Sequence, residues 1–233
     1  MNWTIRHKAV TESTNLDARE GKPGDVFTAD EQTAGRGRLN HTWLSQPGKN
    51  LMMSVVLDVA DLAPQEVATL PLVVGLAAAT ATSLLLLRQT WIKWPNDVMI
   101  YGRKLAGVLC ERHGDSVIAG VGINVNQRSF APEIALRATS LLQIDGQERP
   151  LEMVQRAFLK TLAPFYENWR QNGFAAIHPL IVPCDALKGK QVSVLQTDSD
   201  ATPVSGHCGG IQSDGTLLVG DARVFAGEAH VEL

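Results

Sequence analysis

Residues 91–111 read Trp-Ile-Lys-Trp-Pro-Asn-Asp-Val-Met-Ile-Tyr-Gly-Arg-Lys-Leu-Ala-Gly-Val-Leu-Cys-Glu, and the rest of the chain is organised around them. The aromatic and β-branched start, residues 91–94, predicts a strand. Pro95 favours extended backbone at Trp94, and the Asn-Asp pair that follows accepts turn conformations, so the strand ends there. Two apolar runs, 98–101 and 105–110, flank a glycine-containing turn and predict a hairpin.

Five polar side chains of this stretch lie where the chain reverses direction: Lys93, Asn96, Asp97, Arg103 and Lys104. A rigid sheet can present side chains at such bends to a ligand. The hairpin is therefore a candidate binding surface as well as part of the core.

Composition indicates a soluble globular protein. The chain has 233 residues, of which 45% are hydrophobic and 19% charged, and its net charge is −3. That charge argues against a general nucleic-acid binder. The three cysteines, Cys110, Cys184 and Cys208, form neither a disulfide framework nor a metal-binding spacing, so we expect a reducing cytosol. The first residues lack an apolar signal core, so no secretion signal is expected.

One apolar segment requires a choice between membrane and core. Residues 70–87 carry no charge and are at the lower limit of the length that spans a bilayer. Pro71, Gly75 and three hydroxyl residues interrupt them, and their alanines make them only moderately apolar. We expect a helix from Pro64 to Arg88 that is buried on nearly all sides.

A second distinctive segment is Gly35-Arg36-Gly37-Arg38, which follows a predicted strand at 25–31. Alternating glycines let the backbone approach a ligand closely, and two arginines offer planar positive groups. Such a loop suits a phosphate or a carboxylate, although it lacks the Gly-Lys-Ser/Thr ending of a Walker loop. A basic surface loop or an RNA contact is the alternative interpretation.

Three further strands are predicted in the first 126 residues, at 3–10, 51–59 and 117–125. Ser13 or Thr14 could cap the short helix that follows the first strand.

After residue 126 the pattern changes twice. Residues 127–150 predict loops, and from Leu151 the apolar spacing is helical, with Pro164 expected to kink or break the helix. Short strands separated by turn residues then predict a small β-barrel, at 190–196, 204–212, 216–220 and 223–231. We therefore expect a main domain at 1–184 and a second domain at 185–233.

Four motifs, taken in their order and spacing, resemble those of biotin protein ligases. They are Gly35-Arg36-Gly37-Arg38, Lys93-Trp94-Pro95-Asn96-Asp97, Lys104-Leu105-Ala106-Gly107-Val108 with Glu111, and Gly122-Ile123-Asn124-Val125. The resemblance implies an α+β fold with a mixed, largely antiparallel sheet and helices, like that of class II synthetases. It also implies that the C-terminal strands form an SH3-like barrel.

The resemblance further implies a two-step ligase that uses ATP. Biotin's carboxylate would attack the α-phosphate to give biotinyl-5′-AMP, and a lysine of a biotin carboxyl carrier domain would then take the biotinyl group. The implied catalytic residues are Lys104, Arg38 and Arg36. The implied biotin-binding residues are Ser13, Thr14, Asn15, Gln32, Gly35, Arg36, Gly37, Arg38, Trp43, Lys104 and Gly107. The implied ATP and adenylate residues are Arg38, Asn96, Asp97, Lys104 and Asn124, with Asp97 and Asn124 as magnesium ligands.

Some roles stay open within this resemblance. The family form often has another glycine and arginine where Asn40 and His41 stand, so one positive charge is missing or depends on pH, since an unperturbed histidine titrates near ~6.5. Trp43 could support a closing loop or simply pack. Asp97 could bind magnesium or orient the incoming lysine.

Two rival functions are considered: a lipoate or octanoate ligase of the same superfamily and, from another class, a non-catalytic biotin sensor or transcriptional repressor. The Lys-Trp-Pro-Asn-Asp run favours biotin over lipoate. A repressor would need a DNA-binding segment, for which we expect no room before the first strand. We therefore expect neither DNA nor a membrane as partner, and by analogy a homodimer could form through the sheet.

Overall fold

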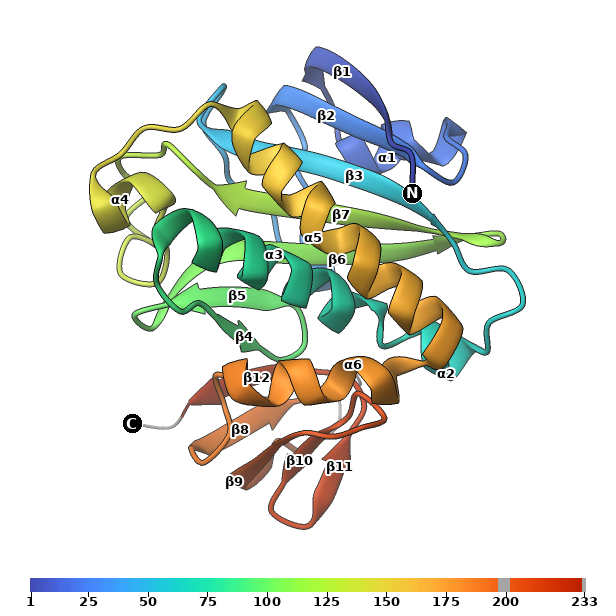
Figure 1. Cartoon of the computed structure of the whole chain (residues 1–233). Helices are drawn as coiled ribbons and strands as arrows, with labels where there is room; N and C mark the ends of the chain where they lie inside the picture. The colour runs from blue at the N-terminus through green and yellow to red at the C-terminus, as the bar shows by residue number, and fades with distance from the viewer. Residues whose placement is uncertain (197–201, 232–233) are drawn as a thin grey trace.

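The computed structural model describes residues 1–196 and 202–231, and its main feature is a seven-stranded sheet (Figure 1). The strand order is β1-β2-β3-β7-β6-β5-β4. β1 runs parallel to β2, and the other neighbouring pairs are antiparallel, which confirms the mixed, largely antiparallel sheet. The strands are β1 (Thr4–Thr11), β2 (Asp25–Gln32), β3 (Asn50–Asp58), β4 (Trp91–Lys93), β5 (Asp97–Ile100), β6 (Arg103–His113) and β7 (Ser116–Asn124).

The pleat of the central strands divides them between two faces. Side chains alternate along a strand, so Val55 and Leu57 of β3 lie in the main core while Ser54 faces the other way. β7 alternates in the same manner, with Val121 and Ile123 in the core and glycines at 120 and 122. One face of the sheet is thus apolar, and the other is hollowed where the glycines carry no side chain.

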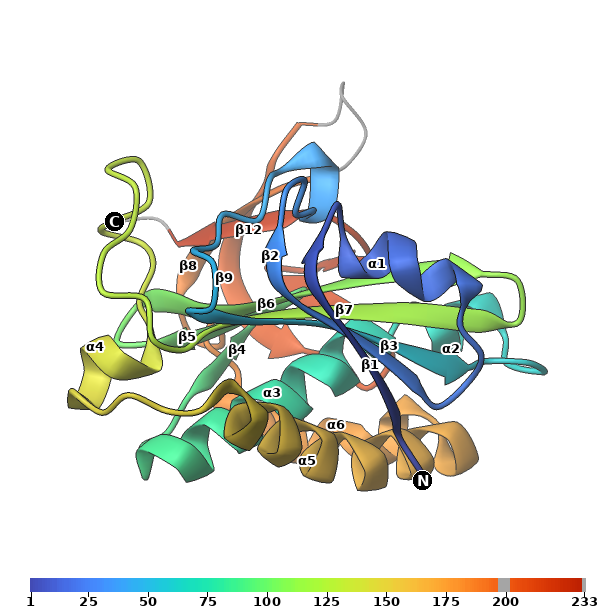
Figure 2. The same ribbon diagram turned by 90° about the horizontal axis from the view of Figure 1, so that it is seen from above.

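Helices cover the apolar face (Figure 2). They are α2 (Pro64–Val67), α3 (Leu70–Leu86), α5 (Leu151–Asn172) and α6 (Phe174–Ile181), and α3 and α5 pack side by side on the sheet, α3 against β4–β7 and α5 against β3. The expected helix at 64–88 is divided because Pro71 cannot donate a backbone hydrogen bond to Val67.

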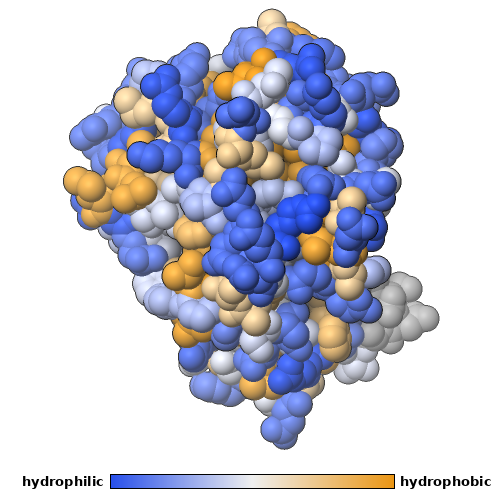
Figure 3. Space-filling model, turned by 45° about the vertical axis from the view of Figure 1, so that its right-hand side comes forward, coloured by the Kyte–Doolittle hydropathy of each residue, from blue (hydrophilic) through white to orange (hydrophobic). Residues whose placement is uncertain are grey.

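The helix pair α2–α3 is long and apolar enough to cross a membrane by composition alone, but 72% of its most apolar window is buried inside the protein. Hydrophobic residues occur only as scattered spots on the face drawn in Figure 3. The interpretation of this segment as a core helix is therefore confirmed.

Two features of the helices differ from the simplest expectation. Residues 127–150 contain a short helix, α4 (Leu141–Asp145), whose N-cap Ser140 accepts a hydrogen bond from the Gln143 amide. Pro164 does not break α5, which is continuous over 22 residues. Pro164 and Lys160, whose carbonyl loses its partner, are both exposed, so water can bond that carbonyl while the buried stripe of α5 holds the helix in place.

The C-terminal strands form a second sheet in the order β11-β10-β9-β8-β12. They are β8 (Gln191–Leu195), β9 (Val204–Ile211), β10 (Leu217–Val219), β11 (Ala222–Val224) and β12 (Glu228–Val231). The single strand expected at 223–231 is two, because the chain turns away after β11 and returns to pair with β8. An SH3-like domain is consistent with this sheet, although no ladder between described residues closes it into a barrel.

The two sheets are joined by hydrogen bonds near the Lys-Trp-Pro-Asn-Asp motif. The Ala186 amide donates to the Ile92 carbonyl at 2.8 Å, and the Trp94 indole donates to the Gly215 carbonyl at 3.1 Å. Arg38 of the main domain reaches the Gly227 carbonyl at 3.2 Å. These contacts place the start of β12 at the rim of the hollowed face.

Candidate functional site

A cavity of about 470 Å³ opens on the hollowed face of the sheet. Its volume lies within the range of small-molecule sites. β3, β7 and β6 provide the floor, the segment from Arg36 to Leu44 crosses above it, and β12 contributes to the rim. The residues that the sequence singled out therefore meet in one place, around one cavity.

The floor is shaped by two glycines beneath Trp43. A β-carbon on Gly122 would lie 2.4 Å from the Trp43 ring, and one on Gly107 would lie 3.1 Å from it. Gly107 and Gly122 are also register partners on β6 and β7. The indole can lie flat on the sheet only because both strands lack a side chain there, and its Nε1 is buried without a hydrogen-bond partner.

We expect Gly122→Ala to displace the indole of Trp43 and to destabilise the fold by about 1–3 kcal/mol, the usual cost of overpacking. Thermal unfolding would report the loss. Gly75→Ala is the matched control, because Gly75 lies inside α3 and a β-carbon there would meet no atom from elsewhere in the fold within 4 Å. That control should stabilise the chain by roughly 0.5–1 kcal/mol; equal stability of the two variants would contradict the packing role of Gly122.

One end of the cavity is polar and uncharged. Ser13, Thr14 and Asn15 at the start of α1 (Thr14–Asp17) are all buried there, and Gln32 ends β2 beside them. The Thr14 amide and hydroxyl lie 2.8 and 3.0 Å from Gln32 Oε1. The capping role considered for Ser13 or Thr14 is not present, because neither hydroxyl bonds a free amide of the helix.

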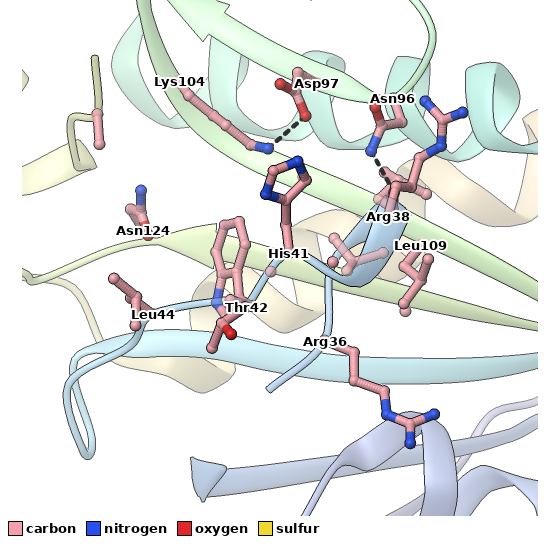
Figure 4. Close-up of a pocket in the computed structure, with 18 of the residues that line it drawn as sticks. Arg36, Arg38, His41, Thr42, Leu44, Asn96, Asp97, Lys104, Leu109 and Asn124 are labelled. Atoms are coloured by element: carbon pink, nitrogen blue, oxygen red, sulfur yellow. Dashed lines mark hydrogen bonds and ion pairs between the residues drawn. The ribbon is translucent and has the colours of Figure 1, made fainter. Parts of the chain in front are cut away.

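The other end is charged. Lys104 Nζ lies 2.6 Å from Asp97 Oδ1 and 5.7 Å from the centre of the Trp43 ring (Figure 4). The approach of the ammonium meets the distance of an ion pair but not the angles of a hydrogen bond, so Asp97 Oδ1 is buried with no hydrogen-bond partner. A ligand with a hydrogen-bond donor for Asp97 Oδ1 and an acceptor for the Lys104 ammonium could satisfy both groups.

The backbone of Lys104 is held by the segment after β7. Its amide donates to the Arg137 carbonyl at 2.7 Å, and its carbonyl accepts from the Thr139 amide at 2.9 Å. Asn124 Nδ2 donates to the Thr139 carbonyl at 3.0 Å, and Asn124 lines the same cavity. Two motifs that are separate in the sequence are thereby fixed against one connecting segment.

Burial changes the acidity of two further cations. The pKa of Lys93 is lowered by burial, and the carboxylates of Asp97 and Glu228 oppose that shift. The pKa of Arg38 is also lowered by burial against the same two carboxylates, although an arginine stays protonated at neutral pH. An anion bound between them would favour the charged form of both groups.

Not every expected residue turns inward. Arg36 lines the cavity, but its guanidinium is exposed and directed away from Lys104 and Asp97 (Figure 4). Gly35 borders an adjoining hollow instead, where its carbonyl accepts from the Trp43 amide. The remaining expected site residues all line the cavity itself: Ser13, Thr14, Asn15, Gln32, Gly37, Arg38, Trp43, Asn96, Asp97, Lys104, Gly107 and Asn124.

Asn96 has a structural duty within this set. Its Nδ2 donates to the Val108 carbonyl at 2.8 Å, and its own carbonyl accepts from the Val108 amide at 2.9 Å. These two bonds lock the Pro95-Asn96-Asp97 turn onto β6, so that Asp97 is held opposite Lys104.

Several lining residues were missed at the sequence level: Arg137, Met52, Leu109, Phe130, Ile134, Glu228 and His230. Lys93, which the sequence placed at a bend of the candidate binding surface but to which it gave no ligand, also lines the cavity. Glu228 carried no signal in the sequence, since only the docking of the second sheet brings it near His41, at 3.8 Å.

The oxygens of Asp97 and Asn124 are the ligand type that Mg²⁺ prefers. The described residues contain no group of three His, Cys, Asp or Glu side chains placed to hold a metal ion. The protein alone therefore supplies at most part of a magnesium shell, which fits an ion bound mainly by a nucleotide's phosphates.

The glycine-floored sheet, the Gly-Arg segment above it and the locked Asn-Asp turn define the protein-ligase class of α+β fold. A model of the biotin/lipoate A/B protein ligase family matches residues 3–127, more than half of the chain. The chain belongs to that family.

Individual relatives agree with this assignment. The chain is 37% identical over 177 residues to the bifunctional ligase/repressor BirA of Bacillus subtilis, which covers 73% of this chain and 53% of the relative. It is 31% identical over 231 residues to the biotin–[acetyl-CoA-carboxylase] ligase of Paracoccus denitrificans, covering 91% and 92%. The solved biotin protein ligase of Aquifex aeolicus, in complex with biotin and ATP, superposes with a TM-score of 0.87 at 30% identity over 98% of both chains. The chain spans about half the length of the Bacillus relatives it matches.

Proposed function

We propose that the chain is an ATP-dependent biotin ligase that forms biotinyl-5′-AMP and transfers the biotinyl group to a lysine of a biotin carboxyl carrier domain. The observation that carries the proposal is the polarity of the cavity, whose uncharged end surrounds Thr14 and Gln32 and whose charged end surrounds Lys104 and Arg38. Gly120, beside the uncharged end, and Asn124, beside the charged end, lie four residues apart on β7, so the two ends of the cavity are separated by roughly 13 Å. An acid with a polar head and a carboxylate tail fits such an arrangement.

In the first step an oxygen of the carboxylate forms a bond to the α-phosphorus, and the bond to pyrophosphate breaks. Two anions must approach, and negative charge builds on the phosphoryl oxygens in the transition state. Lys104, Lys93 and Arg38 are the groups that offset this charge. Asp97 holds the Lys104 ammonium in place until the ligand arrives, through the 2.6 Å ion pair.

In the second step the amine nitrogen of the acceptor lysine attacks the carbonyl carbon of the mixed anhydride, AMP leaves, and the nitrogen loses a proton. The Asp97 carboxylate is the group we assign to orienting that amine. Before transfer, water must be kept from the anhydride. The segment at 36–44 is in the position to do this, because it covers the cavity and is tied to the second sheet through Arg38.

Magnesium supplies charge neutralisation to the triphosphate when it is bound. Asp97 and Asn124 are our candidates to hold it, in agreement with their oxygen donors. We further propose a cytosolic setting, which suits the three free cysteines, and a domain boundary at residue 184, where the chain passes from α6 to the second sheet.

The decisive test is ATP–pyrophosphate exchange with Mg²⁺ in parallel assays containing biotin, lipoate or octanoate. We expect exchange with biotin alone. Exchange with lipoate or octanoate alone would retain the chemistry and replace the substrate, and no exchange with any acid would refute the proposed activity. Removal of Mg²⁺ by a chelator should stop the reaction, since the triphosphate would then lack its counter-charge.

A further inference from the structure

The polar end of the cavity is connected to Glu111 by a chain of hydrogen bonds. Asn15 Nδ2 donates to Glu111 Oε2 at 2.6 Å. The Ser54 hydroxyl lies 2.6 Å from Asn15 Oδ1 and 2.7 Å from the Thr14 hydroxyl. Asn15, Ser54 and Thr14 are all buried, so no bulk water substitutes for these partners.

The direction of each bond follows from what each group can donate. A carboxylate only accepts, so the Asn15 amide must turn its NH₂ to Glu111 and its oxygen to Ser54. Ser54 has one hydroxyl proton. Without that proton between them, Ser54 Oγ and Asn15 Oδ1 would repel each other at their separation of 2.6 Å. Ser54 therefore donates to Asn15 and can offer Thr14 only lone pairs.

Thr14 in turn has no proton to spare for a ligand. Its amide donates to Gln32 Oε1, and its hydroxyl proton must point to Ser54 Oγ, 2.7 Å away, because Ser54 has no proton left for that contact. Toward the cavity Thr14 thus presents oxygen lone pairs. Gln32 has its oxygen occupied and presents its NH₂.

Gly120 keeps the chain of bonds intact. It is the register partner of Ser54 on the adjacent strand, and a β-carbon there would lie 2.2 Å from Asn15 Oδ1. Because Gly120 has no side chain, the sheet leaves room for the Asn15 amide at the point where that amide bonds Ser54.

We propose that Ser54 and Glu111 are positioning residues that act through Thr14 and set this end of the cavity to accept an N–H group of the ligand. The inference rests on the proposed function and deepens it, because a cyclic urea carries such N–H donors while a dithiolane ring or an alkyl end carries none. A ligand without the donor would leave the buried Thr14 oxygen unpaired, and sites of this kind reject such analogues strongly.

The test is a double-mutant cycle on Ser54→Ala and Thr14→Val, read as the dissociation constant of biotin measured by calorimetry without ATP. Losing one buried hydrogen bond should weaken binding by about 5- to 10-fold in Ser54→Ala. Because Ser54 acts through the Thr14 hydroxyl, the double variant should bind no more weakly than Thr14→Val alone. In ATP–pyrophosphate exchange, Ser54→Ala should raise KM for biotin and leave kcat close to wild type.

Matched variants separate positioning from folding. Ser116→Ala removes a strand hydroxyl of β7 outside the cavity and should bind biotin as the wild type does. Glu111→Gln keeps an oxygen for Asn15 and should restore most of the affinity that Glu111→Ala loses. If Ser54→Ala does not fold, Ser54→Cys, with its weak thiol donor, should show an intermediate affinity.

The outcomes distinguish this inference from the proposed function. A wild-type chain that does not bind biotin would overturn both. A wild type that binds biotin while Ser54→Ala binds it equally well would overturn the positioning role alone. Additive losses in the double variant would do the same, because Ser54 would then act independently of Thr14.

Discussion

Replacing Lys104 with alanine is expected to lower biotin-dependent ATP–pyrophosphate exchange by about 10²- to 10³-fold, the usual loss when one preorganised group is removed from developing charge. The backbone of Lys104 is fixed by the fold, since its amide and carbonyl are both bonded to the segment at 137–139. The substitution also leaves the partly buried Asp97 carboxylate without its partner, which adds repulsion toward the phosphates.

The control for this variant is Arg103→Ala. Arg103 precedes Lys104 in the same turn and carries the same charge, but it does not line the cavity. Its exchange rate should stay near that of the wild type. Thermal unfolding of both variants would exclude a folding defect, and a near wild-type rate in Lys104→Ala would remove Lys104 from the first step.

Much of the fold could be predicted because period-two apolar patterns and turn residues are local signals. The hairpin of β5 and β6 follows directly from residues 91–111, and the buried helix α3 follows from an uncharged run too mixed for a membrane. The effect of Pro164 could not be predicted from sequence because it depends on exposure. A carbonyl without a helical partner on the solvent side of α5 costs little free energy when the other side of the helix is packed.

The site could be predicted in part for a related reason. Motif residues at bends, such as Lys104 and Asp97, converge because one hairpin brings them together. Glu228 and the Gly227 carbonyl join this site only through docking of the second sheet, and the bond from Arg38 to Gly227 spans 189 residues of sequence, which no local pattern encodes. The support of Thr14 by Ser54 was hidden because a single serine in an apolar strand carries no motif.

Arg38→Gly is expected to retain adenylate formation in part and to release the adenylate about 10- to 100-fold faster, in line with the loss of one hydrogen bond from a charged donor. Arg38 is half-buried, and its bond to the Gly227 carbonyl ties the covering segment to the residue just before β12. Without that link the segment loses its hold on the second sheet, and glycine adds backbone freedom at the same point.

Release can be measured by starting the reaction with labelled biotin, removing the protein by rapid filtration and counting biotinyl-5′-AMP in the filtrate. The control is Arg223→Gly, which replaces an exposed arginine of β11 outside the cavity and should retain its adenylate as the wild type does.

Arg38→Lys tests the geometry, because an ammonium keeps the charge but lacks the planar guanidinium that bonds Gly227 while facing the cavity. A release rate for Arg38→Lys between those of the wild type and Arg38→Gly would mean that the positive charge and the bond to Gly227 both help to retain the adenylate. Normal retention in Arg38→Gly would show that the cavity holds its product without this tie, and the segment at 36–44 would then no longer account for the exclusion of water.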